Sequence, residues 1–114
     1  MQINEKRIGE ILVVRPLEKR IDASVSTGFK GIMIDWINNG NKQIVLDLSE
    51  VEFIDSSGLG AIVSSLKTIG NEGDLVICRI RETVMNLFRL TRMNRVFQIF
   101  SSEDEAVKAL SNRI

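Results

Sequence analysis

Histidine and tyrosine are absent from the 114 residues, and Cys78 is the single cysteine. Without histidine, no Ser-His or Cys-His nucleophile pair and no histidine metal site can be built. One cysteine excludes an internal disulfide and a cysteine-based zinc site. Acid–base catalysis would depend on carboxylates or lysines tuned by burial, and no spacing nominates such a pair. We therefore expect no catalytic residues, no metal ligands and no cofactor.

The formal net charge is zero, because fifteen basic residues balance fifteen acidic ones. Nucleic-acid-binding domains carry a basic excess, so direct nucleic-acid binding is not expected. A local cluster of Arg89, Arg92 and Arg95 is more simply interpreted as a solvated helix face than as an anion-binding patch. Apolar runs are short, and the N-terminal residues lack the apolar stretch of a secretory signal. These features predict a cytoplasmic domain without membrane insertion.

Apolar runs typical of strands alternate with apolar residues at helical spacing. The segment 11–17 predicts a hairpin or edge strand that Pro16 ends, and further strands are expected at 44–48, 51–54, 75–78 and 96–100. Helices are expected after Asp22 as N-cap, from Ser57 onward, around Val84 to Thr91, and after a capping box formed by Ser102 and Glu105.

Strands separated by helices of this length imply mostly parallel pairing with right-handed crossovers. The length and a hydrophobic share of 44% fit a single folded domain over residues 1–114. The predicted fold class is therefore α/β, with a mixed, mostly parallel sheet of about four to five strands and about four helices.

The segment Asp55-Ser56-Ser57-Gly58-Leu59-Gly60 lies where a predicted strand passes into a helix. Functional residues of α/β sheets gather at such junctions, and free N–H groups at a helix start favour anions. Asp55 or Ser56 is explained most simply as an N-cap. Glycine inside a helix costs about 0.5–1 kcal/mol relative to alanine. Gly58 and Gly60 therefore indicate either tight packing against the sheet or space for a molecule that approaches Ser57.

The glycine pair does not match a nucleotide-binding fingerprint. Val63 occupies the third glycine position of a dinucleotide-binding loop, and no Walker A loop is present. The glycine–x–serine frame of a nucleophile elbow is missing as well.

The segment Glu52 to Gly60 resembles the signature of the STAS-domain family, specifically the bacterial anti-sigma factor antagonists. The similarity extends over nearly the whole chain, through the segments 20–23, 87–91, 96–100 and 105–106. Lys19 and Arg92 depart from the pattern, since many relatives have glycine at these two positions. These departures concern the identity of the partner more than the fold.

The resemblance implies a protein-binding regulator that is not an enzyme. In that family the second serine of Asp-Ser-Ser-Gly is the phosphoacceptor, which corresponds to Ser57. The unmodified antagonist binds an anti-sigma factor serine kinase and frees the sigma factor, phosphorylation by the kinase expels the antagonist, and a PP2C-type phosphatase restores it. The implied partner-binding residues are Asp22, Asp55, Ser56, Ser57, Gly58, Leu59 and Gly60.

Two other functions stay open. A STAS subunit of a lipid-transport ATPase acts as a scaffold and need not carry a phosphorylatable serine, so the pair Ser56-Ser57 argues weakly against it. A small nucleotide-binding enzyme using the loop 55–60 is less favoured, because no general base or metal set supports it. No pattern in the sequence indicates an oligomeric state.

Overall fold

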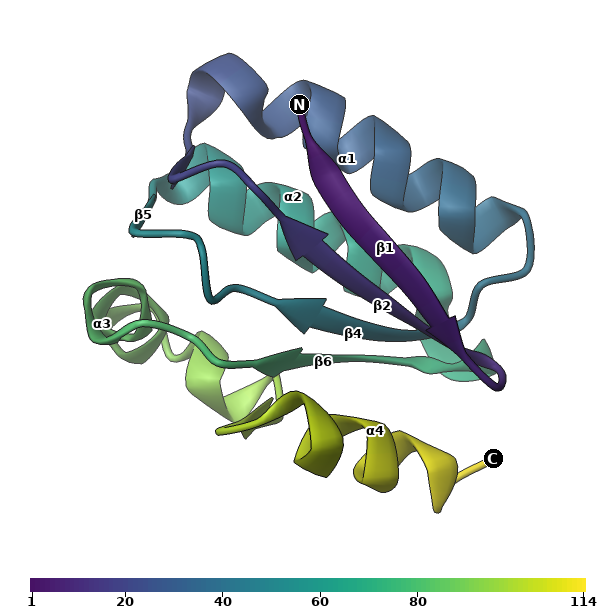
Figure 1. The fold of residues 1–114 in the computed structure, drawn as a ribbon. Coiled ribbons are helices and arrows are strands. Elements are labelled where there is room, and N and C mark those ends of the chain that lie inside the picture. Colours follow the sequence, from purple (N-terminus) through teal and green to yellow (C-terminus); the bar gives the residue numbers. More distant parts are fainter.

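A computed structural model describes residues 1–114 as a mixed five-stranded sheet with helices on both faces (Figure 1). The order of the strands is β1-β2-β4-β6-β7. The β1–β2 pair is an antiparallel hairpin, and the pairs β2–β4, β4–β6 and β6–β7 are parallel. The bounds are β1 Ile3–Ile8, β2 Ile11–Pro16, β4 Gln43–Asp47, β6 Asp74–Cys78 and β7 Ile99–Phe100.

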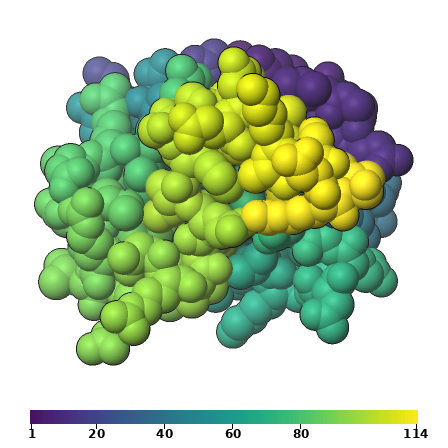
Figure 2. Space-filling model, turned by 90° about the horizontal axis from the view of Figure 1, so that it is seen from below, coloured from purple at the N-terminus to yellow at the C-terminus, as the bar shows by residue number.

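Four α-helices complete the fold: α1 Ala23–Asn38, α2 Ser56–Ile69, α3 Glu82–Leu90 and α4 Glu103–Ser111. Helices α1 and α2 cover one face of the sheet, where their apolar residues join those of α3 in a core of 20 buried residues. Helix α4 covers part of the other face, over a smaller core that contains Val13, Val45 and Val76. Figure 2 shows this second face, with the C-terminal residues running across it beside the N-terminal hairpin. The predicted α/β class is confirmed.

The N-terminal segment forms the predicted hairpin, and β1 rather than β2 lies at the edge of the sheet. The turn between the two strands uses Gly9 in the left-handed region, with φ +59°. Every residue of β1 except Ile3 is exposed, whereas β2 is almost wholly buried between β1 and β4. Charged side chains on an exposed edge strand such as β1 oppose pairing with other chains.

The strand predicted at 96–100 is shorter than expected, because only Ile99–Phe100 pairs with β6. Residues Met93–Arg95 form a 3₁₀ turn, which carries Phe97 into the core against Phe88 with ring centroids 6.0 Å apart. Arg92 precedes this turn in the left-handed region, with φ +61°. This conformation suits glycine better than a residue with a Cβ atom.

The predicted strand at 51–54 does not belong to the main sheet. Phe53–Ile54 forms β5, which pairs in parallel with a second two-residue strand, β3 Arg20–Ile21. The sequence did not predict β3, which lies directly before α1. The small β3–β5 ribbon therefore places the starts of α1 and α2 side by side.

The helix caps follow the sequence closely. Asp22 caps α1, Asp55 caps α2, and the Ser102 hydroxyl accepts a hydrogen bond from the Glu105 N–H at 3.1 Å. The capping box is half formed, because the Glu105 carboxylate accepts from the Ser101 hydroxyl at 3.0 Å instead of from the backbone of Ser102. None of the helices combines the length and the hydrophobicity needed to cross a membrane.

Candidate functional site

The candidate site is built on the β3–β5 ribbon, where two helices begin next to each other. Ile21 pairs with Ile54 at the end of the ribbon, so the following residues, Asp22 and Asp55, lie at matching positions. Asp22 is the N-cap of α1 and Asp55 is the N-cap of α2. The positive ends of two helix dipoles are therefore directed toward one small region of the surface.

One carboxylate joins the two helix starts. Asp55 Oδ1 accepts a hydrogen bond from the Gly58 N–H within its own helix at 2.9 Å. Asp55 Oδ2 accepts from the Ala23 N–H of α1 at 3.1 Å. Hydrogen bonds to ionised groups contribute about 1.5–3 kcal/mol each, so Asp55 holds the two helix starts in a defined arrangement.

Asp22 serves α1 alone. Its Oδ1 accepts from the Ser24 hydroxyl at 2.5 Å and from the Ser24 N–H at 3.0 Å, and Arg20 Nε lies 3.5 Å from Oδ2. The Ser24 hydroxyl and N–H, and then Arg20, hold the pKa of Asp22 below its ordinary value. A carboxylate that is ionised at neutral pH thus stands beside the start of α2.

Ser56 and Ser57 occupy the first two positions of α2, and both are exposed. Asp55 supplies the acceptor that caps this helix, so neither serine hydroxyl is needed for the cap. The simple N-cap interpretation therefore holds for Asp55 and does not extend to the serines. The Ser57 hydroxyl is presented at the positive end of α2.

A shallow depression runs between α1 and α2 beside Ser57. It encloses about 270 Å³ and is lined by Ser26, Thr27, Lys30, Ser57, Gly60, Ala61 and Ser64. Most of these side chains carry hydroxyl groups, and Lys30 is the single cation among them. Thr27 and Lys30 were not predicted as site residues, although their spacing of three places them on one face of the helix that follows Asp22.

The two glycines of the motif lie in different surroundings. A Cβ added to Gly58 would lie 2.1 Å from the carbonyl oxygen of Ile21, so Gly58 is required by close packing of α2 on β3. A Cβ added to Gly60 would meet nothing within 4 Å, and Gly60 opens into the depression beside Ser57. Packing explains the first glycine, and open space surrounds the second.

The seven predicted partner-binding residues are brought to one corner of the molecule, with unequal exposure. Ser56, Ser57 and Gly60 are exposed, Asp22 and Asp55 are half-buried, and Gly58 and Leu59 are buried. Exposed Phe53 extends the surface, and the guanidinium carbon of Arg20 lies 4.1 Å from the centre of its ring. An exposed aromatic ring at the motif is a signal that the sequence carried and that the prediction missed.

Known proteins resemble this chain in sequence and in fold. The family model of the STAS domain matches residues 2–106. A candidate anti-sigma factor antagonist of Thermotoga maritima is 30% identical over 110 residues, which are 95% of this chain and 96% of that protein. The anti-sigma F factor antagonist of Paenibacillus polymyxa is 29% identical over 112 residues, covering 96% of this chain and 95% of that protein. A crystal structure of a candidate anti-sigma factor antagonist from Thermotoga maritima aligns with a TM-score of 0.89 at 28% identity, over 96% of this chain and 94% of that one.

Proposed function

The chain belongs to the STAS domain family, and on this premise we propose that residues 1–114 act as an anti-sigma factor antagonist switched by phosphorylation of Ser57. The unmodified protein binds an anti-sigma factor serine kinase in the cytoplasm and thereby releases a sigma factor. The kinase phosphorylates Ser57, and the phosphorylated antagonist dissociates from the kinase. A PP2C-type phosphatase restores the unmodified form. The protein itself catalyses no step of this cycle.

The exposure of Ser57 at the joined helix starts is the observation that carries the proposal. The hydroxyl lies on the surface, next to Gly60, where no side chain obstructs the approach of a kinase active site. Asp55 fixes the backbone around it through hydrogen bonds to both helices. A rigid, unobstructed hydroxyl suits both docking and phosphoryl transfer, because little conformational entropy is lost on binding.

Phosphorylation of Ser57 is expected to act at the interface and to leave the fold intact. A phosphate group adds a charge of about −1.5 to −2 at neutral pH. The start of α2 and the nearby Lys30 stabilise this charge within the free domain. In a complex the same charge must be desolvated close to the carboxylates of Asp22 and Asp55. Each 1.4 kcal/mol of that unfavourable free energy weakens binding about tenfold.

The proposal is tested by incubating the protein with a candidate anti-sigma factor kinase and labelled ATP, then locating the phosphate by mass spectrometry. Ser57→Ala should abolish labelling, and Ser56→Ala, which alters the adjacent exposed hydroxyl, should retain it. Labelling of Ser57→Ala at the wild-type rate would refute the assignment of the site. Hydrolysis of ATP by the isolated chain would instead favour a nucleotide-binding enzyme.

A further inference from the structure

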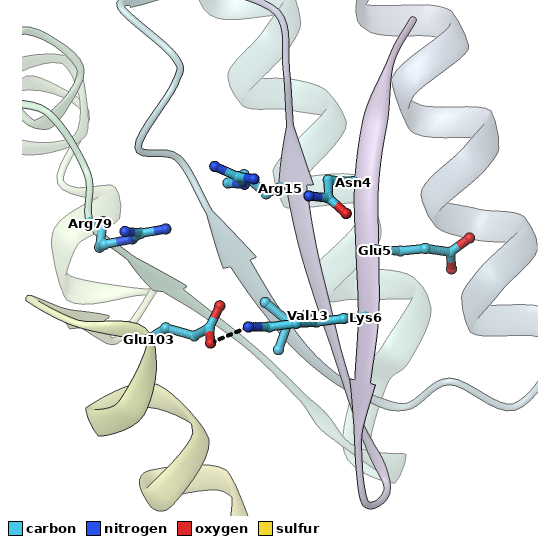
Figure 3. A pocket seen from close by; sticks show the side chains of 7 residues that line it. All are labelled: Asn4, Glu5, Lys6, Val13, Arg15, Arg79 and Glu103. Atoms are coloured by element: carbon cyan, nitrogen blue, oxygen red, sulfur yellow. Dashed lines mark ion pairs between the residues drawn. The ribbon is translucent and has the colours of Figure 1, made fainter.

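A second polar cavity lies on the face of the sheet opposite α1 and α2, away from Ser57. It encloses about 190 Å³ and is lined by Asn4, Glu5, Lys6, Val13, Arg15, Arg79 and Glu103 (Figure 3). These residues come from β1, β2, the position after β6 and the first turn of α4. Arg15 and Arg79 stand at the carboxyl ends of parallel strands, where sheets of this class bind their ligands.

Two guanidinium groups face each other in this cavity. Figure 3 shows Arg15 and Arg79 pointing toward one another from opposite walls, while Glu5 points away from the cavity. Arg79 donates hydrogen bonds from Nε and Nη2 to the carboxylate of Asp47, and Nε lies 3.1 Å from Asp47 Oδ2. Arg15 Nη1 lies 3.4 Å from Glu50 Oε1. Each arginine is therefore held in place by a carboxylate outside the cavity lining, and Asp47 lies on β4, between the strands that carry the two arginines.

The backbone of Arg79 supports a binding role for this arrangement. Its φ of +53° lies in the left-handed region, which is unfavourable for a residue with a Cβ atom. Asp47, whose side chain is 1% exposed, pairs with the guanidinium and holds it in position. Strained backbone conformations of this kind concentrate at ligand sites.

A third cation completes the lining. Lys6 Nζ lies 2.7 Å from Glu103 Oε2, so this ion pair joins β1 to the first turn of α4. The Lys6 side chain is 57% exposed and can rotate away from Glu103 without disturbing the core. An anion entering between the arginines would compete with Glu103 for Lys6.

We propose that this cavity binds the phosphate group of a small phosphate monoester. Arg15 and Arg79 donate hydrogen bonds to the phosphate oxygens from opposite sides, and Lys6 leaves Glu103 to add a third donor. The planar guanidinium fork matches the geometry of phosphate oxygens. Arg15 Nε and Nη2 and Arg79 Nη1 make no hydrogen bond within the protein and are left to donate to them. This site goes beyond the proposed switch, because none of its residues belongs to the Ser57 surface.

The test is an NMR titration of the full chain with inorganic phosphate, and then with glycerol 3-phosphate, at constant ionic strength. We expect saturable shifts of the Arg15 and Arg79 side-chain N–H signals with both ligands. Arg15→Gln should weaken binding about tenfold or more. Arg7→Gln is the matched control, because Arg7 lies on β1 but bonds to Asn41 outside the cavity, and it should leave binding unchanged.

Glu103 provides a test in the opposite direction. Glu103→Gln frees Lys6 and should strengthen phosphate binding severalfold, whereas Asp104→Asn, the same charge change in the same turn of α4, should have little effect. If Arg15→Gln and Arg7→Gln weaken phosphate binding equally, the loss is a general effect of charge, and the proposed site is refuted. Binding of inorganic phosphate without glycerol 3-phosphate would refute the monoester class. Ser57→Ala should bind phosphate as wild type does, so the two proposals fail or succeed separately.

Discussion

Replacement of Asp55 by alanine removes the carboxylate that joins the starts of α1 and α2. Asp55 accepts hydrogen bonds from the Gly58 N–H at 2.9 Å and from the Ala23 N–H at 3.1 Å. Loss of one N-cap side chain costs about 0.5–2 kcal/mol. Because two helix starts lose an acceptor together, Asp55→Ala should lower the free energy of unfolding by about 2–3 kcal/mol. Asp55→Asn keeps one carbonyl oxygen and should lose about half as much.

Urea unfolding, followed by circular dichroism, measures this change as a shift of the midpoint at constant slope. The control is Ser102→Ala, because Ser102 caps α4 through one N–H, that of Glu105 at 3.1 Å. This variant should lose about 1 kcal/mol. If Asp55→Ala is no less stable than Ser102→Ala, Asp55 does not hold the two helices together, and our account of the site's rigidity is wrong.

Three further predictions concern neighbouring features. Gly58→Ala places a Cβ 2.1 Å from the Ile21 carbonyl oxygen and should lower the free energy of unfolding by about 2 kcal/mol or more. Gly60→Ala adds a Cβ in open space and should raise the free energy of unfolding by about 0.5–1 kcal/mol. Thermal unfolding of the two variants measures both changes. Burial raises the pKa of Cys78 to about 12, so the thiol should react with thiol reagents only as fast as the protein opens, and rapid labelling of the native protein would contradict this. The pKa of Asp22 is lowered in the folded state, so its stabilisation is present above the unfolded value of about 3.9 and is lost as pH falls through the lower folded value. Asp22→Asn should therefore flatten the acid limb of the stability curve, and an unchanged limb would argue against the Ser24 hydrogen bonds as the cause.

Part of the candidate site could be predicted from local sequence. An aspartate before a helical stripe indicates an N-cap, and the segment 52–60 resembles the STAS signature strongly enough to nominate Ser57. The sequence left the reason for the two glycines open, since nothing within the motif shows that Ile21 packs against Gly58 and leaves Gly60 free. Lys30 was missed because its neighbour in space, Ser57, is 27 positions away along the chain.

The sequence by itself determined the α/β class, the four helices, the side-chain caps of α1, α2 and α4, and the family resemblance, because periodicity and capping depend on residues within a few positions of one another. Only the tertiary structure decided the β3–β5 ribbon, since strands of two residues have no measurable period. Through that pairing Asp55 reaches Ala23, and through the order of the main sheet Arg15 comes to face Arg79. Both arrangements depend on which strands lie side by side, a choice made by burial of the whole core rather than by any local segment.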